Sequence, residues 1–266
     1  MSDSPKSVLE GVDAVIDSHF FSGEQSPGYQ YHHKRSWNAL SKNPPKGFDG
    51  SALIDAMGSR IEENLKIRSN CAPSQDNWSL RSTKHQHLIE TARENDSDEV
   101  TLERAIVQRW PKDWTYQMPV ASGLFGSRTD KRRAVDLVFD HKNGHYEFVE
   151  LKIKSDTPLH AAMEILKYGL VYLASRKDRA ENLAYDGAVL PILRASRITL
   201  CVLAPQRYYG DRDVAWLEDS INEGLKRSAV PGLSIDFRFE QFKFPWDSDS
   251  SPNDLPETLG RQPVCR

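Results

Sequence analysis

The chain has 266 residues and a formal net charge of −3, from 35 lysines and arginines against 38 aspartates and glutamates. Its three cysteines, Cys71, Cys201 and Cys265, are odd in number and far apart, which excludes a disulfide scaffold and a cysteine-based zinc site. No apolar stretch approaches the roughly 18 residues of a membrane span, and the first residues lack a signal-peptide pattern, so we expect a cytoplasmic protein without a membrane partner.

Residues 1–94 predict a mainly helical and irregular N-terminal extension. Apolar spacing favours a short amphipathic helix over residues 8–21 and a second helix from Ser51 to Lys66. Residues 22–50 are rich in Ser, Gly, Pro, Asn and Lys and predict a loop, and residues 68–85 are again irregular. The adjacent histidines of Tyr31-His32-His33-Lys34 have no partner ligands at metal spacing, so we expect them in a loop.

Residues 95–245 predict an α/β domain. Asp96-Ser97-Asp98-Glu99 is typical of a helix start, and the helix should end before Pro111. Further helices are expected over residues 158–174 and 215–226, and strands over residues 115–120, 134–140, 145–153, 197–203 and 233–239. This order predicts helices on both sides of a mixed β-sheet whose first strands are antiparallel. The Ser-, Asp- and Pro-rich residues 246–266 predict a disordered tail.

Asp136 can meet Glu150 only if the hairpin between their strands has the right register. The two-residue period of a strand places Glu150 and Lys152 on one face. A two-residue loop would set Asp136 opposite Leu151, whereas a three-residue loop, Lys142-Asn143-Gly144, sets it opposite Glu150. We predict the three-residue form with Gly144 at positive φ, and a β-bulge would give the same alignment.

Asp136, Glu150 and Lys152 together resemble the motif of the PD-(D/E)xK nuclease superfamily, which has the restriction-endonuclease-like fold. Asp136, Glu150 and Lys152 match its Asp…Glu-x-Lys pattern in order, spacing and strand context, with Val135 where the motif has proline. The resemblance covers about residues 95–245.

Two helices carry further parts of the resemblance. Glu103 resembles the acid that many members carry on the helix before the sheet. Glu164 and Tyr168 resemble a Gln-x-x-x-Tyr element of the exonuclease branches, with glutamate in place of glutamine.

The resemblance implies a nuclease that hydrolyses phosphodiester bonds with Mg²⁺, or with Mn²⁺ in its place. DNA is expected in preference to RNA, with a 5′-phosphate product and a role in restriction, phage defence or repair. Asp136, Glu150 and the carbonyl of Leu151 would hold the cation, and Glu103 would bind it directly or through water. Lys152 would orient the attacking water or help to deprotonate it.

Basic residues are concentrated just before the motif. From residue 104 to residue 133, seven basic residues stand against two acids, an excess of +5 in a chain of −3. Arg128, Lys131, Arg132 and Arg133 are therefore candidates for contacts with nucleic-acid phosphates. His160, Glu164 and Tyr168, on the following helix, are candidates for the same role. A solvated charge run and an ordinary helix flank are the alternatives.

Other readings of the sequence remain open. The fold could serve as a non-catalytic module that binds nucleic acid or a protein partner, because Glu-x-Lys alone often marks a solvated, ion-paired strand face. The N-terminal extension could instead make an interaction protein, or could hold a protein partner or a second copy in a homodimer. Asp140-His141-Lys142 is a second Asp-x-Lys match, but it runs into the turn, so we expect its side chains to lie at the surface without a catalytic role.

Overall fold

The computed structural model describes residues 7–21, 28–66, 74, 76–80, 97–123, 133–177, 190–228, 230–247 and 249–265. Its helices are α1 (Val12–Phe20), α2 (Lys34–Leu40), α3 (Gly50–Lys66), α5 (Asp98–Arg109), α7 (Pro158–Lys177), α8 (Gln206–Tyr209) and α9 (Ala215–Arg227), with 3-10 turns η1 (Pro191–Arg194) and η2 (Pro252–Asp254). Its strands are β1 (Trp114–Pro119), β2 (Ala134–Lys142), β3 (His145–Leu151), β4 (Arg197–Pro205), β5 (Ser234–Phe242) and β6 (Gln262–Pro263). Within these ranges, no helix has the length and hydrophobicity to cross a bilayer.

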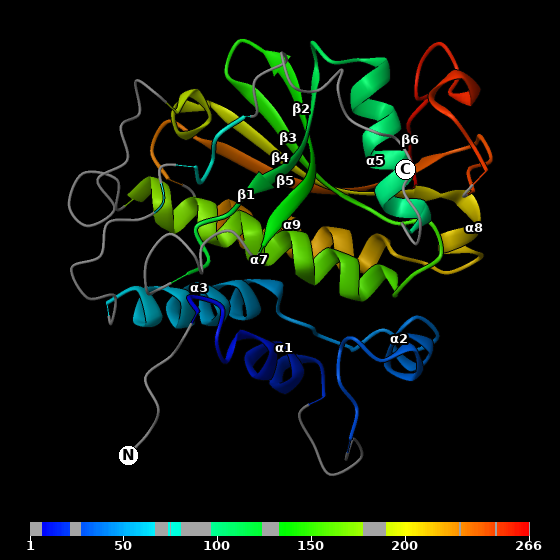
Figure 1. The fold of residues 1–266 in the computed structure, drawn as a ribbon. Helices are drawn as coiled ribbons and strands as arrows, with labels where there is room; N and C mark the ends of the chain where they lie inside the picture. Colours follow the sequence, from blue (N-terminus) through cyan, green and yellow to red (C-terminus); the bar gives the residue numbers. More distant parts are fainter. Residues whose placement is uncertain are drawn as a thin grey trace.

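A mixed six-stranded sheet, in the order β1-β2-β3-β4-β5-β6, forms the centre of the molecule (Figure 1). Strands β1, β2 and β3 are antiparallel, β3, β4 and β5 are parallel, and β6 is antiparallel to β5. Strand β4 is buried from Ile198 to Pro205, as its nearly continuous apolar sequence predicts for a central strand. The chain is thus an α/β protein with helices flanking a mixed sheet.

Helices cover both faces of the sheet (Figure 1). Helices α7 and α9 lie on one face and α5 on the other, while α3 packs on the outer side of α7 and α9, with α1 beside it. Because α7 has the sheet on one side and α3 on the other, it is buried around almost its whole circumference and not only along one apolar stripe. The N-terminal helices therefore share one hydrophobic core with the sheet.

Helix α2 lies within residues 22–50, where the sequence predicted a loop, and this prediction is wrong there. Trp37 and Leu40 are one helical turn apart and both are buried. In a helix, residues three apart lie on the same face, so the two apolar side chains can be buried together although the rest of the segment is polar. Most of the irregular segment 68–85 lies outside the described residues.

The C-terminal segment, predicted to be disordered from residue 246, is packed against the sheet. Trp246, Leu255 and Leu259 are buried, and β6 pairs with β5. The side chain of Arg261 lies between buried carboxylates of the sheet. The segment is polar overall, which is why the sequence predicted disorder. Its few apolar side chains are nevertheless buried, and their burial is sufficient to hold a short segment against the sheet.

The β2–β3 hairpin has the alternative geometry that the sequence left open. Lys142 pairs with His145, so Asn143 and Gly144 form a two-residue loop in which both have positive φ, 54° and 77°. A bulge between Asp140 and Lys142 then shifts the register by one residue, so that Leu137 lies opposite Val149. The predicted three-residue loop is wrong, but the bulge restores the alignment.

The close crossing of α3 and α9 requires glycine. A Cβ atom on Gly224 would lie 2.6 Å from the carbonyl oxygen of Gly50 and 2.6 Å from Cδ1 of Ile54. Because these glycines have no side chains, the backbones of α3 and α9 can approach closely. Helix α3 therefore packs against both α9 and α7.

Candidate active site

Asp136 and Glu150 lie opposite each other on β2 and β3. The pairing of Leu137 with Val149, continued by one residue, sets Asp136 opposite Glu150. The backbone N–H of Leu151 donates to Oδ2 of Asp136 over 2.9 Å, which fixes this carboxyl beside its neighbour. Glu150 is only 2% exposed. The sheet register therefore brings two carboxyl groups together, with Glu150 buried and Asp136 half-buried.

Lys152 follows β3 directly and is surrounded by carboxylates. Its backbone N–H donates to the carbonyl of Leu203 over 3.0 Å, so β4 holds it in line with the strand. Its Nζ lies 2.7 Å from Oε1 of Glu150 and 3.6 Å from both Oδ2 of Asp156 and Oε2 of Glu164. Lys152 is 8% exposed, so this ammonium is nearly buried.

Glu103 reaches the same carboxyl cluster from α5. It is 4% exposed, and Nε2 of Gln117 donates to its Oε2 over 2.7 Å. Gln117 lies in β1 with a φ of 51°, an uncommon conformation for a residue other than glycine. Burial raises the pKa of Glu103 well above its ordinary value, and the charge of Asp136 raises it further. The sequence analysis found Glu103 but had no signal for Gln117.

Three predicted residues of α7 border this cluster. The hydroxyl of Tyr168 donates to Oε1 of Glu164 over 3.3 Å, and Glu164 in turn contacts Lys152. His160 has its Nδ1 3.2 Å from Oδ1 of Asp156. Asp156 thus contacts both Lys152 and His160, and it has a φ of 59°. Sequence reasoning missed Asp156, although an aspartate is among the few residues that readily adopt such a φ.

The N-terminal segment also reaches the edge of this site. The rings of Tyr31 and His32 lie 5.6 Å and 6.2 Å from the ring of His160. The hydroxyl of Tyr31 donates to Oδ1 of Asp13 over 2.7 Å, and Nζ of Lys167 lies 3.0 Å from both. The pair of histidines after Tyr31 was noted in the sequence, but its polar surroundings gave no indication that this segment contacts His160.

Burial and like charge shift the protonation of the carboxyl groups. Burial raises the pKa of Asp136 to about 6, although the Lys152 ammonium and the Leu151 N–H oppose this shift. Burial and the charge of Asp136 raise the pKa of Glu150 well above its ordinary value, and the same causes act on Glu103. The cluster therefore holds more negative charge than its buried position favours.

Lys152 remains charged in this environment. Burial lowers the pKa of its ammonium, but Glu150 and Glu164 outweigh burial, so the pKa lies above its ordinary value. Burial would also raise the pKa of Glu164, but Lys152 and His160 hold it below its ordinary value. The pair is therefore ionised at neutral pH.

The donor set fits a hard divalent cation. Oε2 of Glu150 is buried and has no hydrogen-bond partner within the described residues. Asp136 and Glu103 are close enough for their charges to act on each other, and carboxylate oxygens are the ligands that Mg²⁺ prefers. Leu151, expected to offer its carbonyl, lies between Glu150 and Lys152. A divalent cation would neutralise the charge that makes this burial costly.

The basic stretch before β2 is described only at its end. Arg133 is exposed, and its charge acts on Tyr168 and Asp13, so it faces the α7 side of the site. Arg128, Lys131 and Arg132 lie outside the described residues. Their predicted contact with nucleic acid stays a prediction.

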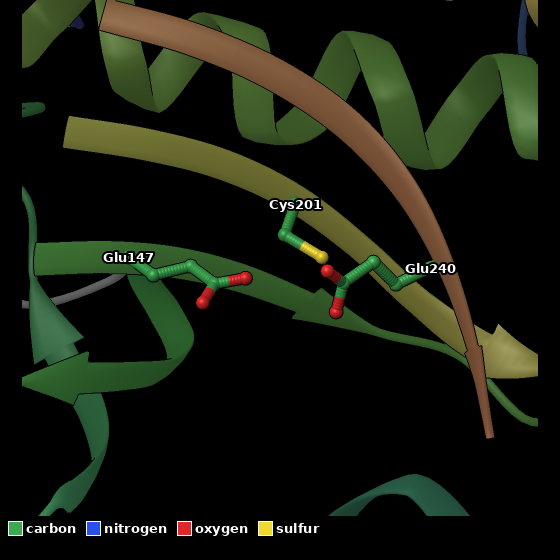
Figure 2. A group of neighbouring side chains, drawn as sticks. All are labelled: Glu147, Cys201 and Glu240. Carbon is green, nitrogen blue, oxygen red and sulfur yellow. The ribbon is translucent and has the colours of Figure 1, made fainter. Parts of the chain in front are cut away.

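A second polar cluster lies on the opposite face of the sheet. Figure 2 shows Glu147, Cys201 and Glu240 on neighbouring strands, and their ligand atoms lie within 4.8 Å of one another. Arg261 donates to Glu147 and, over 2.5 Å, to Oε2 of Glu240. Arg238 lies 3.1 Å from Glu147 and 2.8 Å from Glu240.

These arginines make the second cluster an ion-pair network. Burial would raise the pKa of Glu147, but Arg261, His141 and Arg238 hold it well below its ordinary value. The guanidinium groups of Arg238 and Arg261 therefore already neutralise the carboxylates that would have to serve as ligands for a metal ion. The rival Asp140-His141-Lys142 belongs to this side: Lys142 is exposed and pairs with Asp140 over 3.2 Å, as a surface motif should.

Comparisons with family models, with curated proteins and with solved structures find no match to this chain.

Proposed function

We propose that the protein is a metal-dependent nuclease of the PD-(D/E)xK superfamily that hydrolyses phosphodiester bonds, with DNA preferred to RNA. The observation that carries the proposal is the contact of the Lys152 ammonium, 2.7 Å from Glu150, beside a buried Glu150 oxygen that has no hydrogen-bond partner among the described residues. Buried polar atoms usually have a hydrogen-bond partner, so this oxygen is unusual, and it is available as a ligand for a cation.

The chain's own residues have distinct roles in this proposal. Asp136, Glu150 and the Leu151 carbonyl would hold Mg²⁺, and Glu103 would bind it directly or through water. When bound, the cation supplies positive charge that stabilises the reacting phosphate. Lys152 keeps its proton at neutral pH because Glu150 and Glu164 raise its pKa, so it acts as a charged donor to the attacking water or to a phosphate oxygen and not as a base.

The test is cleavage of plasmid, linear duplex, single-stranded DNA and RNA with Mg²⁺ or Mn²⁺. The variants are Glu150→Gln and Lys152→Met, with Lys142→Met as the matched control, since Lys142 is exposed on the same hairpin. We expect Glu150→Gln to remove activity, Lys152→Met to lower it by about 10²–10³-fold, and Lys142→Met to leave it unchanged.

Each outcome selects one reading. Metal-dependent cleavage that is lost in Glu150→Gln and Lys152→Met supports the nuclease, and the substrate panel identifies its preferred nucleic acid. Cleavage that persists in both variants rejects this site. A wild type that binds nucleic acid in a salt-dependent way without cutting it supports the non-catalytic binding module instead.

A further inference from the structure

A groove beside α8 adjoins the candidate active site. It consists of a hollow of about 380 Å³, bordered by α2, the start of α7 and α8, and a hollow of about 680 Å³, bordered by α8 and the end of β5. Both are lined by Ile153, Arg207 and Gly210, so they adjoin, and together we call them the α8 groove. Figure 1 shows α2, α8 and the first turn of α7 at the same end of the sheet.

The lining of the α8 groove is basic, although the chain is acidic overall. Two carboxylates, Asp156 and Asp211, stand against five cations, an excess of +3 in a chain of −3. The cations are Lys34, Lys154, Arg207, Arg212 and Lys243. All five are exposed. Cations gathered in a concave surface focus their field on an approaching polyanion.

Among the described residues, one of these five cations forms an ion pair and the other four do not. Lys154 pairs with Asp98 over 2.6 Å. Within the part of the chain that the structure describes, no ion pair involves Lys34, Arg207, Arg212 or Lys243. Their charges are therefore available to a ligand at no loss of an internal contact.

Tyr208 connects this groove to Lys152. Tyr208 lines the smaller hollow, and its hydroxyl is buried and has no hydrogen-bond partner within the described residues. Burial raises the pKa of Tyr208 well above its ordinary value, and Lys152, Asp156 and Glu150 are the charges that act on it most. The hydroxyl thus keeps its proton and lies close to the carboxyl cluster as an unused donor.

The geometry also brings the groove to the catalytic lysine directly. Asp156 lines the smaller hollow and lies 3.6 Å from Nζ of Lys152. Thr157 and Pro158, at the N-terminal end of the 20-residue helix α7, line the same hollow. The positive end of this helix dipole adds to the attraction for phosphate.

We propose that the phosphodiester backbone of a nucleic acid lies along the α8 groove, with Arg207 and Arg212 on its phosphates and the Tyr208 hydroxyl on the phosphate nearest Lys152. The substrate class in this inference rests on the proposed function. The groove would therefore bind substrate with residues of α8 and of the segment that follows it, far along the chain from the basic stretch before β2.

The test measures binding separately from cleavage. Fluorescein-labelled duplex DNA, single-stranded DNA and RNA of 24 nucleotides are titrated in EDTA at several salt concentrations, with fluorescence anisotropy as the readout. The variants are Arg207→Ala with Arg212→Ala, and Tyr208→Phe. Arg194→Ala is the matched control, because Arg194 is exposed before β4, at the other end of that strand. Glu150→Gln separates binding from metal chemistry.

Each lost phosphate contact should lower the slope of log K against log salt by about 0.9, which weakens binding roughly eightfold per arginine at 0.1 M salt. We expect the double variant to show both changes, Tyr208→Phe to bind more weakly with an unchanged slope, Arg194→Ala to bind like wild type, and Glu150→Gln to retain salt-dependent binding although it does not cleave.

Other results overturn the inference. It is wrong if the double variant keeps the affinity and slope of wild type, or if wild type binds none of the three nucleic acids at low salt. Metal-dependent cleavage with unaffected groove variants rejects the groove but leaves the proposed function intact. Binding that depends on the groove arginines, without any cleavage, supports the groove and rejects the proposed nuclease activity.

Discussion

Asp136→Asn should make the metal-free protein more stable while it removes activity. Asp136 receives the Leu151 N–H over 2.9 Å, and the amide oxygen of asparagine can accept the same bond. The substitution therefore keeps the local geometry and removes only the ionisable group. A site that is built to hold a cation should gain stability when one of its partly buried negative charges is neutralised.

The size and the pH dependence of this gain follow from the pKa. Burial raises the pKa of Asp136 from 3.8 to about 6, so the folded state binds the proton more tightly than the unfolded state. Ionisation then costs the folded state up to about 3 kcal/mol, from about two pKa units at 1.36 kcal/mol each. The cost is absent below pH 3.8, grows as the pH rises, and is complete above pH 6. The gain of Asp136→Asn should follow the same course.

The assay is urea unfolding of wild type and variant in EDTA, from pH 4 to pH 8. Asp140→Asn serves as the control, because Asp140 pairs with Lys142 at the surface and should change the free energy of unfolding by less than about 1 kcal/mol. Added Mg²⁺ should stabilise wild type but not Asp136→Asn. A variant that is less stable than wild type at pH 7.5, or a gain that does not depend on pH, would refute the reasoning.

Three further substitutions test the structure by urea unfolding. Arg261→Ala should destabilise the protein by about 3–5 kcal/mol, because it leaves the buried carboxylate of Glu147 without its main partner; adding Glu147→Gln should recover part of the loss, and a neutral Arg261→Ala would contradict the C-terminal packing. Tyr208→Phe should be neutral or stabilising by about 1 kcal/mol, because it removes a buried hydroxyl that has no partner among the described residues; a clear loss would show that the hydroxyl is bonded. Gly224→Ala should cost at least about 1–3 kcal/mol, since its Cβ would lie 2.6 Å from the Gly50 carbonyl, and a wild-type unfolding midpoint would reject the close crossing of α3 and α9.

Sequence patterns predicted the first five strands of the sheet and its central motif, but not β6, which lies in the segment predicted to be disordered. Alternation along β2 and β3 placed Glu150 and Lys152 on one face, and the apolar run of β4 indicated a central strand, because these patterns report local periodicity and burial directly. They also predicted the positive φ of Gly144, since a tight hairpin turn requires it. Patterns of this kind depend only on residues that are close along the chain.

Contacts between distant residues were settled by the tertiary structure. The bulge that aligns Asp136 with Glu150, the insertion of Arg261 beside Glu147, and the approach of Tyr208 to Lys152 each join segments that are separated in sequence. Residues such as Arg261 and Tyr208 carry no periodic signal, because a single side chain is enough to fill a pocket formed by other strands. The sequence by itself therefore determined the α/β order and the candidate motif. The tertiary structure decided which polar residues surround the motif, because burial and partner distance depend on how the layers pack.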